Sequence, residues 1–465
     1  MNERANRLQP YAVLAIFFLA ALAFRPLLPV DETRYLTVAW EMFQRGSFFV
    51  PTLNFFPYHH KPPLLFWLID ASWALFGPSR PAALLVVFAI SSLSLHLTRR
   101  LAETLLPNRP DIASRVEWVM LGNAVFLLYS SLILFDLLLT CCVLAAFLSL
   151  HAFARSGRRR DAVVFGLLVG LGILAKGPVV LVHLVWPVLL YLWWKPSPQV
   201  LTNGAFYRGV GLGLLAALVP VAVWLGPALL RTDGEFARAL LWNQSAGRIS
   251  GQMEASHPRP FYFYVVLLPV MLLPWLASPT LWRAVRAPAI RFETSEGRAL
   301  RFLLVWSGAV LATFSLISGK QPHYLVPLLP LVTIVLTVLL ADATLRSIRR
   351  TALALAAGLV LFQAVASLAL FPRYDLDPIA AFVRDHPEAR FGFVGGYQGE
   401  LNFLARRTQP IELVALEHAD AWFNAYPGGY LIDFYKATDP TPGRPVVTTN
   451  YRGGLAGVFE KSAVP

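Results

Sequence analysis

Hydrophobic positions along the chain form long runs separated by short polar segments. A helix needs about 20 apolar residues to cross a hydrocarbon core of about 30 Å, and fewer where aromatic or long cationic side chains extend its ends. The pattern therefore predicts eleven transmembrane helices, with tight hairpins at Asp136 and at Lys176. They are expected near residues 9–28, 80–98, 117–135, 137–154, 161–175, 178–194, 209–230, 261–281, 302–318, 324–341 and 351–371.

The pattern changes after Phe371. The remaining chain carries strand-like segments such as "RFGFVGG", "GYLIDF" and "RPVVTT", and one helix-like segment, "DPIAAFVRDH". We therefore predict a transmembrane domain over residues 1–371, with polar loops over 29–79 and 231–260. A small α/β domain over 372–465 is expected to follow it.

Composition agrees with a polytopic α-helical membrane protein. The chain is 56% hydrophobic and only 14% charged, whereas about a quarter of an ordinary soluble domain is charged. The net charge of +13 does not indicate a nucleic-acid partner, because the basic residues lie between apolar segments and not on one soluble domain. Cys141 and Cys142 are adjacent within an apolar run, which suits buried small side chains and no disulfide framework or zinc site.

The basic residues of the loops predict the orientation. If the N-terminus is cytoplasmic, the cytoplasmic loops hold 20 Lys and Arg residues and the opposite loops up to residue 371 hold 11. An odd number of spans then places the C-terminal domain and the interfacial helices in the periplasm. A cleaved signal peptide is the alternative for the N-terminus, because Arg4 and Arg7 precede an apolar run. Cleavage would gain nothing for a chain anchored many times.

With this topology the polar residues that could carry chemistry gather on one face. Charged side chains at a membrane boundary are costly unless they are paired or hydrated, so a functional site is the default interpretation. The set therefore predicts an outer cavity close to the membrane. It consists of Asp31, Glu32, Arg34, His59, His60, Lys61, Asp136, Lys176, Arg248, His257, Arg259, Lys320, His323 and Tyr324.

Three acidic residues are candidates for proton transfer and for sugar binding. Asp31 and Glu32 open the segment "DETRYLTVAWEMF", which predicts a helix along the membrane interface. A helix cap is the alternative role for Asp31. Asp136 is the sole charge between two apolar spans, and it could orient a sugar or assist a base, or cap the hairpin.

The cationic residues indicate a phosphate ligand. Two prolines after Lys61 stiffen the chain and hold the ammonium at a fixed height, although an ordinary snorkelling lysine is the alternative. Arg248 and Arg259 can fork onto phosphate oxygens or act as interface anchors, and Tyr324 adds a neutral donor. Several cations with few acids between them favour an anionic lipid headgroup. Gly-Pro after Lys176 favours a turn and a structural lysine.

The histidines leave a metal site open. His60 and His257 could meet across the cavity, but no H-E-x-x-H or other tight metal spacing is present. We therefore expect no required cofactor and keep a divalent metal ion as a minor alternative.

Together these residues resemble the bacterial C-type glycosyltransferases related to aminoarabinose lipid A transferase and to protein O-mannosyltransferases. The resemblance rests on "DETRYLTVAWEMFQRGSFFVPTLN", "HHKPPLLFWL", the lone Asp136, "AKGP", "HPRPFYFY" and "FSLISGKQPHYLVPLLP", in the family's order over residues 31–330. It implies an inverting glycosyltransferase of the bacterial inner membrane. The enzyme would move aminoarabinose or a hexose from a polyprenyl-phosphate donor, such as undecaprenyl phosphate, to lipid A or another envelope glycan or protein on the periplasmic face.

The resemblance also implies roles for individual residues. An amino sugar would need an acid near its ammonium, for which Glu32 and Asp136 are candidates. The family often has an acidic residue where this chain has His60, which weighs further against a metal. By the resemblance, Asp31 is the carboxylate near the acceptor, Lys61 and Arg259 (or Arg248) hold the donor phosphate, Tyr324 assists, and Asp136 lines the sugar site.

Two other classes of protein fit the spans but not the polar pattern. A transporter or flippase of lipid-linked sugars should carry polar residues in both leaflets and an internal repeat, and the sequence shows neither. A membrane-anchored binding protein would need a recognisable motif in the C-terminal region, which has none. The sequence therefore predicts an enzyme and leaves the acceptor and the oligomeric state open.

Overall fold

The computed structural model describes residues 3–196, 200–232, 258–286 and 293–462. Within these ranges seven helical segments are long and apolar enough to cross a membrane. The chain is therefore a multi-pass helical membrane protein. The seven are α1 (Glu3–Phe24), α4 (Arg80–Leu105), α7 (Asp136–Ser156), α11 (Asn203–Leu230), α16 (Ser295–Leu316), α18 (Leu345–Ala369), and η3 (Pro322–Leu328) continued by α17 (Leu329–Leu339).

The other four predicted spans form shorter elements or one helix with charged ends. The Asn123 side chain accepts a hydrogen bond from the Phe126 amide at 3.1 Å and begins a new helix inside the apolar run near 117–135. The span predicted near 161–175 is α8, whose ends carry Arg159, Arg160, Asp161 and Lys176. The elements are α5 (Pro110–Leu121), α6 (Ala124–Tyr129), α8 (Arg159–Lys176), α9 (Val179–Leu189), α10 (Tyr191–Trp194), α14 (Phe263–Leu272), η2 (Trp275–Ala277) and α15 (Pro279–Arg286).

The chain divides into two compact units, and each combines separate stretches of sequence. The first unit comprises residues 1–18, 59–65 and 84–359, and the second comprises 19–58, 66–83 and 360–465. The C-terminal region thus shares a unit with the segment that follows the first span. The predicted boundary between residues 371 and 372 stays a prediction.

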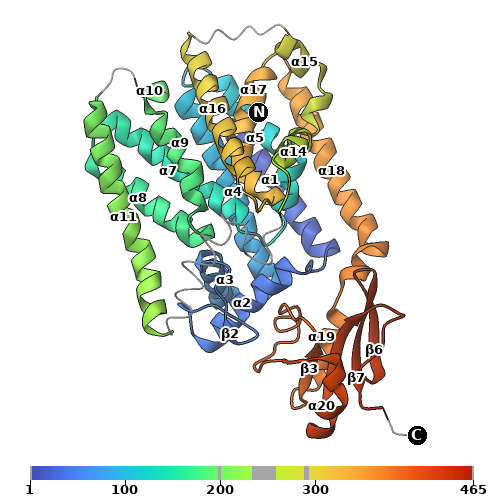
Figure 1. The fold of residues 1–465 in the computed structure, drawn as a ribbon. Coiled ribbons are helices and arrows are strands. Elements are labelled where there is room, and N and C mark those ends of the chain that lie inside the picture. The colour runs from blue at the N-terminus through green and yellow to red at the C-terminus, as the bar shows by residue number, and fades with distance from the viewer. Residues whose placement is uncertain (1–2, 197–199, 233–257, 287–292, 463–465) are drawn as a thin grey trace. The chain divides into compact units, whose positions relative to one another are not determined.

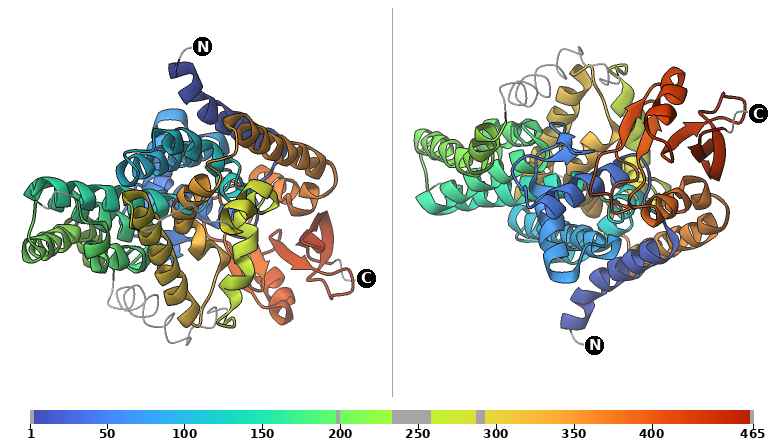
Figure 2. Two further views of the ribbon diagram at one scale, coloured as in Figure 1. Left: turned by 90° about the horizontal axis from the view of Figure 1, so that it is seen from above. Right: turned by 90° about the horizontal axis from the view of Figure 1, so that it is seen from below.

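In the helical first unit, α8 and α11 lie side by side at very short range (Figures 1 and 2). A Cβ atom on Gly166 would lie 1.8 Å from the carbonyl oxygen of Gly213, and one on Gly170 would lie 2.5 Å from that of Ala217. Lipid removes most of the hydrophobic drive for helix association, so close backbone contact between small residues supplies much of the attraction. The spacing of these glycines therefore holds the two helices together.

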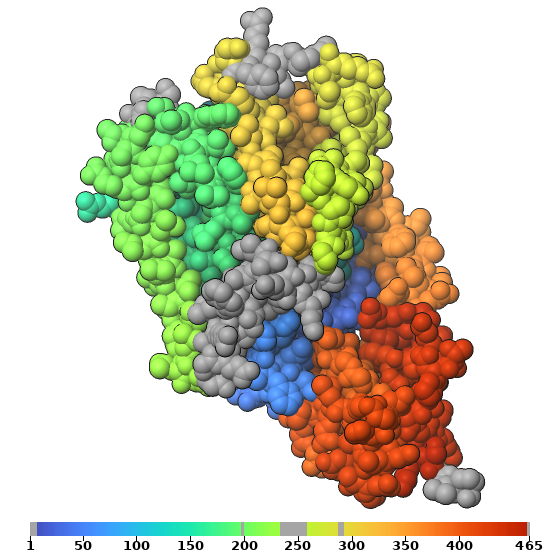
Figure 3. Space-filling view, viewed as in Figure 1, coloured from blue at the N-terminus to red at the C-terminus, as the bar shows by residue number. Residues whose placement is uncertain are grey.

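Among the described residues, α11 also has a face that the other elements leave exposed. Figure 3 shows this surface in green, and it carries the exposed side chains of Leu214, Leu215, Leu218 and Val219. An uninterrupted apolar surface on a long helix suits contact with lipid. One face of α11 thus packs on α8 through small residues, and the other is suited to contact with the bilayer.

We predict that Gly166→Ala weakens the packing of α8 on α11. The added methyl meets a backbone carbonyl that cannot rotate away, so the helices must separate, which costs about 1–3 kcal/mol. Gly211→Ala on α11 is the matched control, because a Cβ there meets nothing within 4 Å. The melting temperature of the full chain in detergent should fall for Gly166→Ala and not for the control. Equal melting temperatures would contradict the proposed packing.

The second unit contains two helices that flank a short hairpin, and a mixed sheet with its own helices. The sheet order is β4-β3-β5-β7-β6, with β3 parallel to β4 and β5, and β7 antiparallel to β5 and β6. The elements are α2 (Asp31–Arg45), β1 (Thr52–Leu53), β2 (Phe56–Pro57), α3 (Leu64–Phe76), η4 (Phe371–Tyr374), α19 (Asp377–Asp385), β3 (Phe391–Val394), β4 (Glu412–Val414), η5 (Leu416–His418), α20 (Ala419–Ala425), β5 (Tyr430–Tyr435), β6 (Arg444–Tyr451) and β7 (Gly454–Glu460).

The strand-like and helix-like segments of the C-terminal region form the expected elements. "RFGFVGG", "GYLIDF" and "RPVVTT" contribute to β3, β5 and β6, and "DPIAAFVRDH" forms α19. Ile379 and Val383 of α19 are fully buried against Phe393, Ile432 and Val458 of the sheet. The alternation of apolar and polar positions thus identified this region correctly as α/β.

Helix α2 is built into the second unit, and its apolar stripe is buried in protein. Its place along the membrane interface stays a prediction. Val38 and Ala39 are completely buried. The hydroxyl of Thr37 donates to the Gly399 carbonyl at 2.6 Å, and the indole of Trp40 donates to the Arg407 carbonyl at 2.8 Å. These contacts join residues more than 350 positions apart, which the local pattern could not reveal.

A buried carboxylate strengthens this connection. Glu41 is completely buried and accepts hydrogen bonds from the Thr52 hydroxyl at 2.7 Å, the Phe55 amide at 2.8 Å and the Asn402 amide at 2.9 Å. Burial raises the pKa of Glu41, and these hydrogen bonds oppose the rise. The network ties α2 to the β1–β2 hairpin and to the C-terminal region.

Another buried carboxyl, Asp433 of β5, makes the stability of the second unit depend on pH. Burial raises its pKa to about 6. A carboxyl whose pKa is raised in the folded state contributes its full stability below the unfolded value of about 4. That contribution is lost as the pH rises through about 6.

We predict that Asp433→Asn stabilises the protein at pH 8 by about 1 kcal/mol, after allowance for partial solvent screening, and has little effect at pH 4. Glu388→Gln, at an exposed position, is the control. Melting temperatures of the full chain recorded between pH 4 and 8 check this. A difference between wild type and Asp433→Asn that does not grow with pH would refute it.

Candidate functional site

The centre of the polar cluster in the first unit is an ion pair between Asp136 and Lys176. Asp136 is the first residue of α7 and Lys176 is the last of α8, and their side chains are 4% and 7% exposed. Phe135 and not Asp136 occupies the N-cap position of α7, and the Asp136 carboxylate is bound by Lys176. Two buried charges are tolerable when they are paired with each other.

Two further predicted residues lie next to this pair. The Lys176 ammonium is 5.4 Å from the ring centroid of Tyr324, and the Lys61 ammonium is 5.8 Å from that of Phe135, the residue before Asp136. Cations at this range are attracted to the face of an aromatic ring. The structure therefore brings Lys61, Asp136 and Tyr324 together, although they are far apart in sequence.

Sequence reasoning favoured a structural role for Lys176 and did not predict its ion pair with Asp136. Its interpretation as a structural lysine rested on the turn that follows it, and that turn is present, since Gly177 has a φ of 77°. A turn does not determine what the side chain contacts. The available signal was the isolated charge within an apolar run, which Lys176 shares with Asp136.

Arg259 is held close to the start of η3 by its main chain. Its amide donates to the Ser318 carbonyl at 3.3 Å, and its carbonyl accepts from the Lys320 ammonium at 2.9 Å. The guanidinium lies 4.4 Å from the ring centroid of Phe263, which leaves the planar fork able to meet an anion. Rings connect this region to the cluster, because Phe314 lies 5.5 Å from Tyr324 and 6.4 Å from Tyr264.

The Lys320 ammonium is engaged by main-chain carbonyls of this region and is not a free cation. It is only 2% exposed, and its ammonium also donates to the Ile317 carbonyl at 2.5 Å. Burial lowers the pKa of Lys320. Its contacts fix the loop between α16 and η3, and so they support the positions of Arg259 and Tyr324.

Asp31 and Glu32 belong to the second unit and have different environments. Asp31 begins α2, its side chain is 55% exposed, and a carboxylate oxygen lies 3.7 Å from the Arg34 guanidinium. The N-cap position of α2 is Val30 and not Asp31. Glu32 is buried, and both of its carboxylate oxygens accept from Arg25. Asp31 is therefore accessible for chemistry, while Glu32 is engaged in an internal ion pair.

The remaining predictions concern His60, His257 and Arg248. His60 is exposed, with its ring 4.8 Å from that of His59. His257 and Arg248 lie outside the described residues. Over the part of the chain that the structure describes, no group of three or more His, Cys, Asp or Glu side chains could hold a metal ion.

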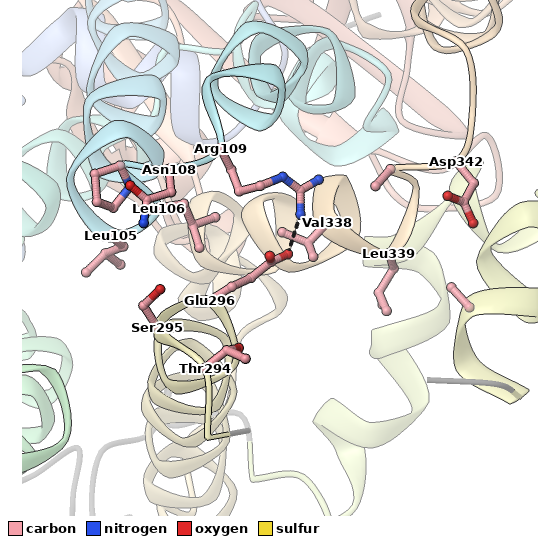
Figure 4. A pocket seen from close by; sticks show the side chains of 13 residues that line it. Leu105, Leu106, Asn108, Arg109, Thr294, Ser295, Glu296, Val338, Leu339 and Asp342 are labelled. Atoms are coloured by element: carbon pink, nitrogen blue, oxygen red, sulfur yellow. Dashed lines mark hydrogen bonds and ion pairs between the residues drawn. The ribbon is translucent and has the colours of Figure 1, made fainter. Parts of the chain in front are cut away.

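A cavity of about 490 Å³ in the first unit contains none of the predicted site residues. Figure 4 shows Arg109 on its wall, paired with Glu296 at 2.6 Å. Arg109 also binds Asp111 through two hydrogen bonds of 2.9 Å. Two carboxylates thus neutralise this cation, which ties the start of α5 to the start of α16 and does not suit phosphate binding.

Known proteins share this sequence pattern. The family of dolichyl-phosphate-mannose-protein mannosyltransferases matches residues 60–224, which include Lys61, Asp136 and Lys176. An undecaprenyl phosphate-alpha-4-amino-4-deoxy-L-arabinose arabinosyl transferase of Pseudomonas paraeruginosa is 30% identical over 400 residues, covering 81% of this chain and 69% of that protein. Its counterpart in Pseudomonas aeruginosa is 30% identical over 340 residues, covering 70% and 59%.

Solved structures share the fold. ArnT from Cupriavidus metallidurans in the apo state superimposes with a TM-score of 0.77 at 17% identity, covering 97% of each chain. The same protein bound to undecaprenyl phosphate gives a TM-score of 0.72, covering 98% of each chain. The fold and the relatives define a membrane-embedded glycosyltransferase. The chain belongs to the family of undecaprenyl phosphate-alpha-4-amino-4-deoxy-L-arabinose arabinosyl transferases.

We predict that Asp136 and Lys176 are energetically coupled. Removing one partner leaves the other charge buried and unpaired, so Asp136→Asn and Lys176→Gln should each lower stability by about 3 kcal/mol. The double variant should lose much less than the sum of the two, which melting temperatures of all four proteins would reveal. Strictly additive losses would show that the pair carries no coupling.

Proposed function

We propose that this protein transfers a 4-amino-4-deoxy-L-arabinose unit from undecaprenyl phosphate to lipid A at the periplasmic face of the inner membrane. The names of the relatives specify this donor, and the similar ArnT has been solved with undecaprenyl phosphate. The observation that carries the proposal is the buried Asp136–Lys176 pair with Lys61 and Tyr324 beside it. Such a cluster offers fixed cations and one carboxylate to a sugar phosphate.

The reaction is an inverting displacement. An acceptor oxygen attacks the anomeric carbon of the sugar, the acceptor proton passes to a carboxylate, and the bond from that carbon to the phosphate oxygen breaks. Undecaprenyl phosphate leaves with one more negative charge. Cations that are already in place stabilise this growing charge in the transition state without reorganising.

Each candidate residue has a role in this scheme. Asp31 is the base, because its carboxylate is exposed at the start of α2, 3.7 Å from the Arg34 guanidinium. Lys61 and Arg259 bind the donor phosphate, with Arg248 as the alternative to Arg259, and Tyr324 donates a hydrogen bond to it. Asp136, oriented by Lys176, accepts hydrogen bonds from the sugar or its ammonium.

Glu32 supports Asp31 within the second unit. Its carboxylate is already bound by Arg25 and by the Leu28 amide at 2.9 Å. It is therefore a positioning residue that fixes the start of α2, and so the direction of Asp31, and it does not itself take a proton. This replaces the catalytic role for Glu32 suggested by its place in the sequence.

The membrane topology and the metal are also part of the proposal. The N-terminus is cytoplasmic, the C-terminal region is periplasmic, and four further segments complete the eleven spans, namely α5 with α6, α8, α9 with α10, and α14 with η2. No cofactor is required. Dialysis against EDTA, which should leave activity unchanged, tests this against a divalent ion at His60 and His257.

We predict that Asp31→Asn and Lys61→Ala abolish or strongly reduce transfer by the purified protein. Loss of one phosphate-binding cation from a dry site should cost about a hundredfold in kcat. Asp385→Asn and Lys436→Ala, at exposed positions of the C-terminal region, are matched controls that should keep full activity. Transfer is measured with undecaprenyl-phosphate-linked aminoarabinose and lipid A.

Three results would contradict the proposal in different ways. Full activity in both Asp31→Asn and Lys61→Ala would remove the assigned site. Transfer from a mannose-linked donor and not from the aminoarabinose donor would change the substrate. No transfer by the wild type with any polyprenyl-linked sugar would exclude the enzyme.

A further inference from the structure

The second unit contains a cavity of about 260 Å³ whose walls come from the ends of three membrane-spanning helices. Leu27 lies three residues after the end of α1, Arg80 is the first residue of α4, and Tyr374 lies five residues after the end of α18. A helix end at which an apolar span meets polar chain marks the membrane boundary. The cavity therefore opens at the level of lipid headgroups.

Three arginines line this cavity, namely Arg80, Arg384 and Arg406. Each donates to a main-chain carbonyl: Arg80 to Ala21 at 2.8 Å, Arg406 to Pro78 at 2.9 Å, and Arg384 to Leu404 at 3.3 Å. Carbonyl contacts orient a guanidinium but do not neutralise its charge. None of the three has a carboxylate within 4.0 Å in the described part of the chain.

Two hydrogen-bond donors of these arginines have no acceptor among the described residues. The Nε of Arg80 and the Nη1 of Arg406 are buried and have no hydrogen-bond partner. A buried, unpaired donor on a charged group is costly, so such a group in a native structure calls for an explanation. The Arg406 guanidinium also lies 5.1 Å from the ring centroid of Trp40 and 4.2 Å from that of Phe403, and both contacts restrict its orientation.

Two carboxylates, those of Asp375 and Asp377, also line the cavity. Asp375 and Asp377 lead into α19, and the Asp377 amide donates to the Asp375 carboxylate at 2.9 Å. Three cations and two acids leave an excess of positive charge. The arrangement offers forks for phosphate oxygens and acceptors for the hydroxyl or ammonium that a lipid headgroup carries next to its phosphate.

We infer that this cavity binds the phosphate group of a lipid headgroup at the membrane boundary. Neither Lys61 nor Arg259, which are assigned to the donor phosphate, lines it. It is therefore a second phosphate site, and its existence does not depend on the proposed reaction. The same phosphate chemistry could come from a bulk phospholipid or from the lipid acceptor, and two measurements separate these sources.

The first measurement is direct binding. Delipidated full-length protein is titrated with phosphatidylglycerol and observed by native mass spectrometry. Because each guanidinium offers charge-assisted hydrogen bonds to the phosphate, Arg80→Gln and Arg406→Gln should each weaken one tight site about tenfold or more. Arg444→Gln is the control, since this arginine is exposed and lies on β6.

Folding is checked separately. Arg406→Lys keeps the charge and loses the fork, so it should show an intermediate affinity at an unchanged melting temperature. Arg384→Gln removes an exposed side chain and should weaken binding without loss of fold. If the Arg80→Gln, Arg406→Gln double variant bound phosphatidylglycerol and lipid A as wild type does, the inference would be overturned.

The second measurement identifies the source of the phosphate. If the acceptor occupies the cavity, lipid A should compete with phosphatidylglycerol, and Arg406→Gln should raise the KM for lipid A about tenfold with kcat and the donor KM unchanged. If a bulk phospholipid occupies the cavity, Arg406→Gln should lose phosphatidylglycerol binding while its KM values for lipid A and for the donor stay at the wild-type level. An inactive wild type would refute the proposed function, while the binding titration would still decide this inference.

Discussion

A charge placed among apolar helices must be paired, and the ion pair between Asp136 and Lys176 meets this requirement where α7 begins and α8 ends. The pairing fixes both helix ends and the ring of Tyr324 beside them. The same constraint acts elsewhere in the helical unit, where the buried Glu117 accepts hydrogen bonds from Tyr11 at 2.7 Å and Arg99 at 3.5 Å. At these two places, paired charges help to fix where the helices meet.

Helix α8 can present Lys176 to Asp136 because its other face packs so closely on α11. Gly166 and Gly170 allow the two backbones to touch, and this contact needs no polar group inside the bilayer. Gly177 then adopts a positive φ, which lets the chain leave α8 directly after the lysine. Small residues and one turn therefore place a cation whose own side chain contributes little to packing.

The second unit uses buried carboxylates in a comparable way. Glu32 is paired with Arg25, and Glu41 is satisfied by three neutral donors, so α2 is tied at both ends. Trp73 of α3 stacks on Phe403 at 5.3 Å, which adds the C-terminal region to the support of these helices. Asp31 stays exposed on this rigid element, as a residue that exchanges protons with a substrate must. The C-terminal region thus helps to build the unit that carries the proposed base.

The sequence by itself determined the membrane class, seven helices long and apolar enough to span a membrane, the α/β character of the C-terminal region, and Lys61, Asp136 and Tyr324 as candidates for one site. These follow from hydropathy and from the cost of burying charge, which are properties of short segments. Only the tertiary structure decided that Lys176 pairs with Asp136, 40 residues away, and that Glu32 forms an ion pair with Arg25. It also decided that α2 is buried and that three arginines from distant segments line one cavity. These features depend on which segments meet, and a buried side chain takes its role from its partner more than from its neighbours in the chain.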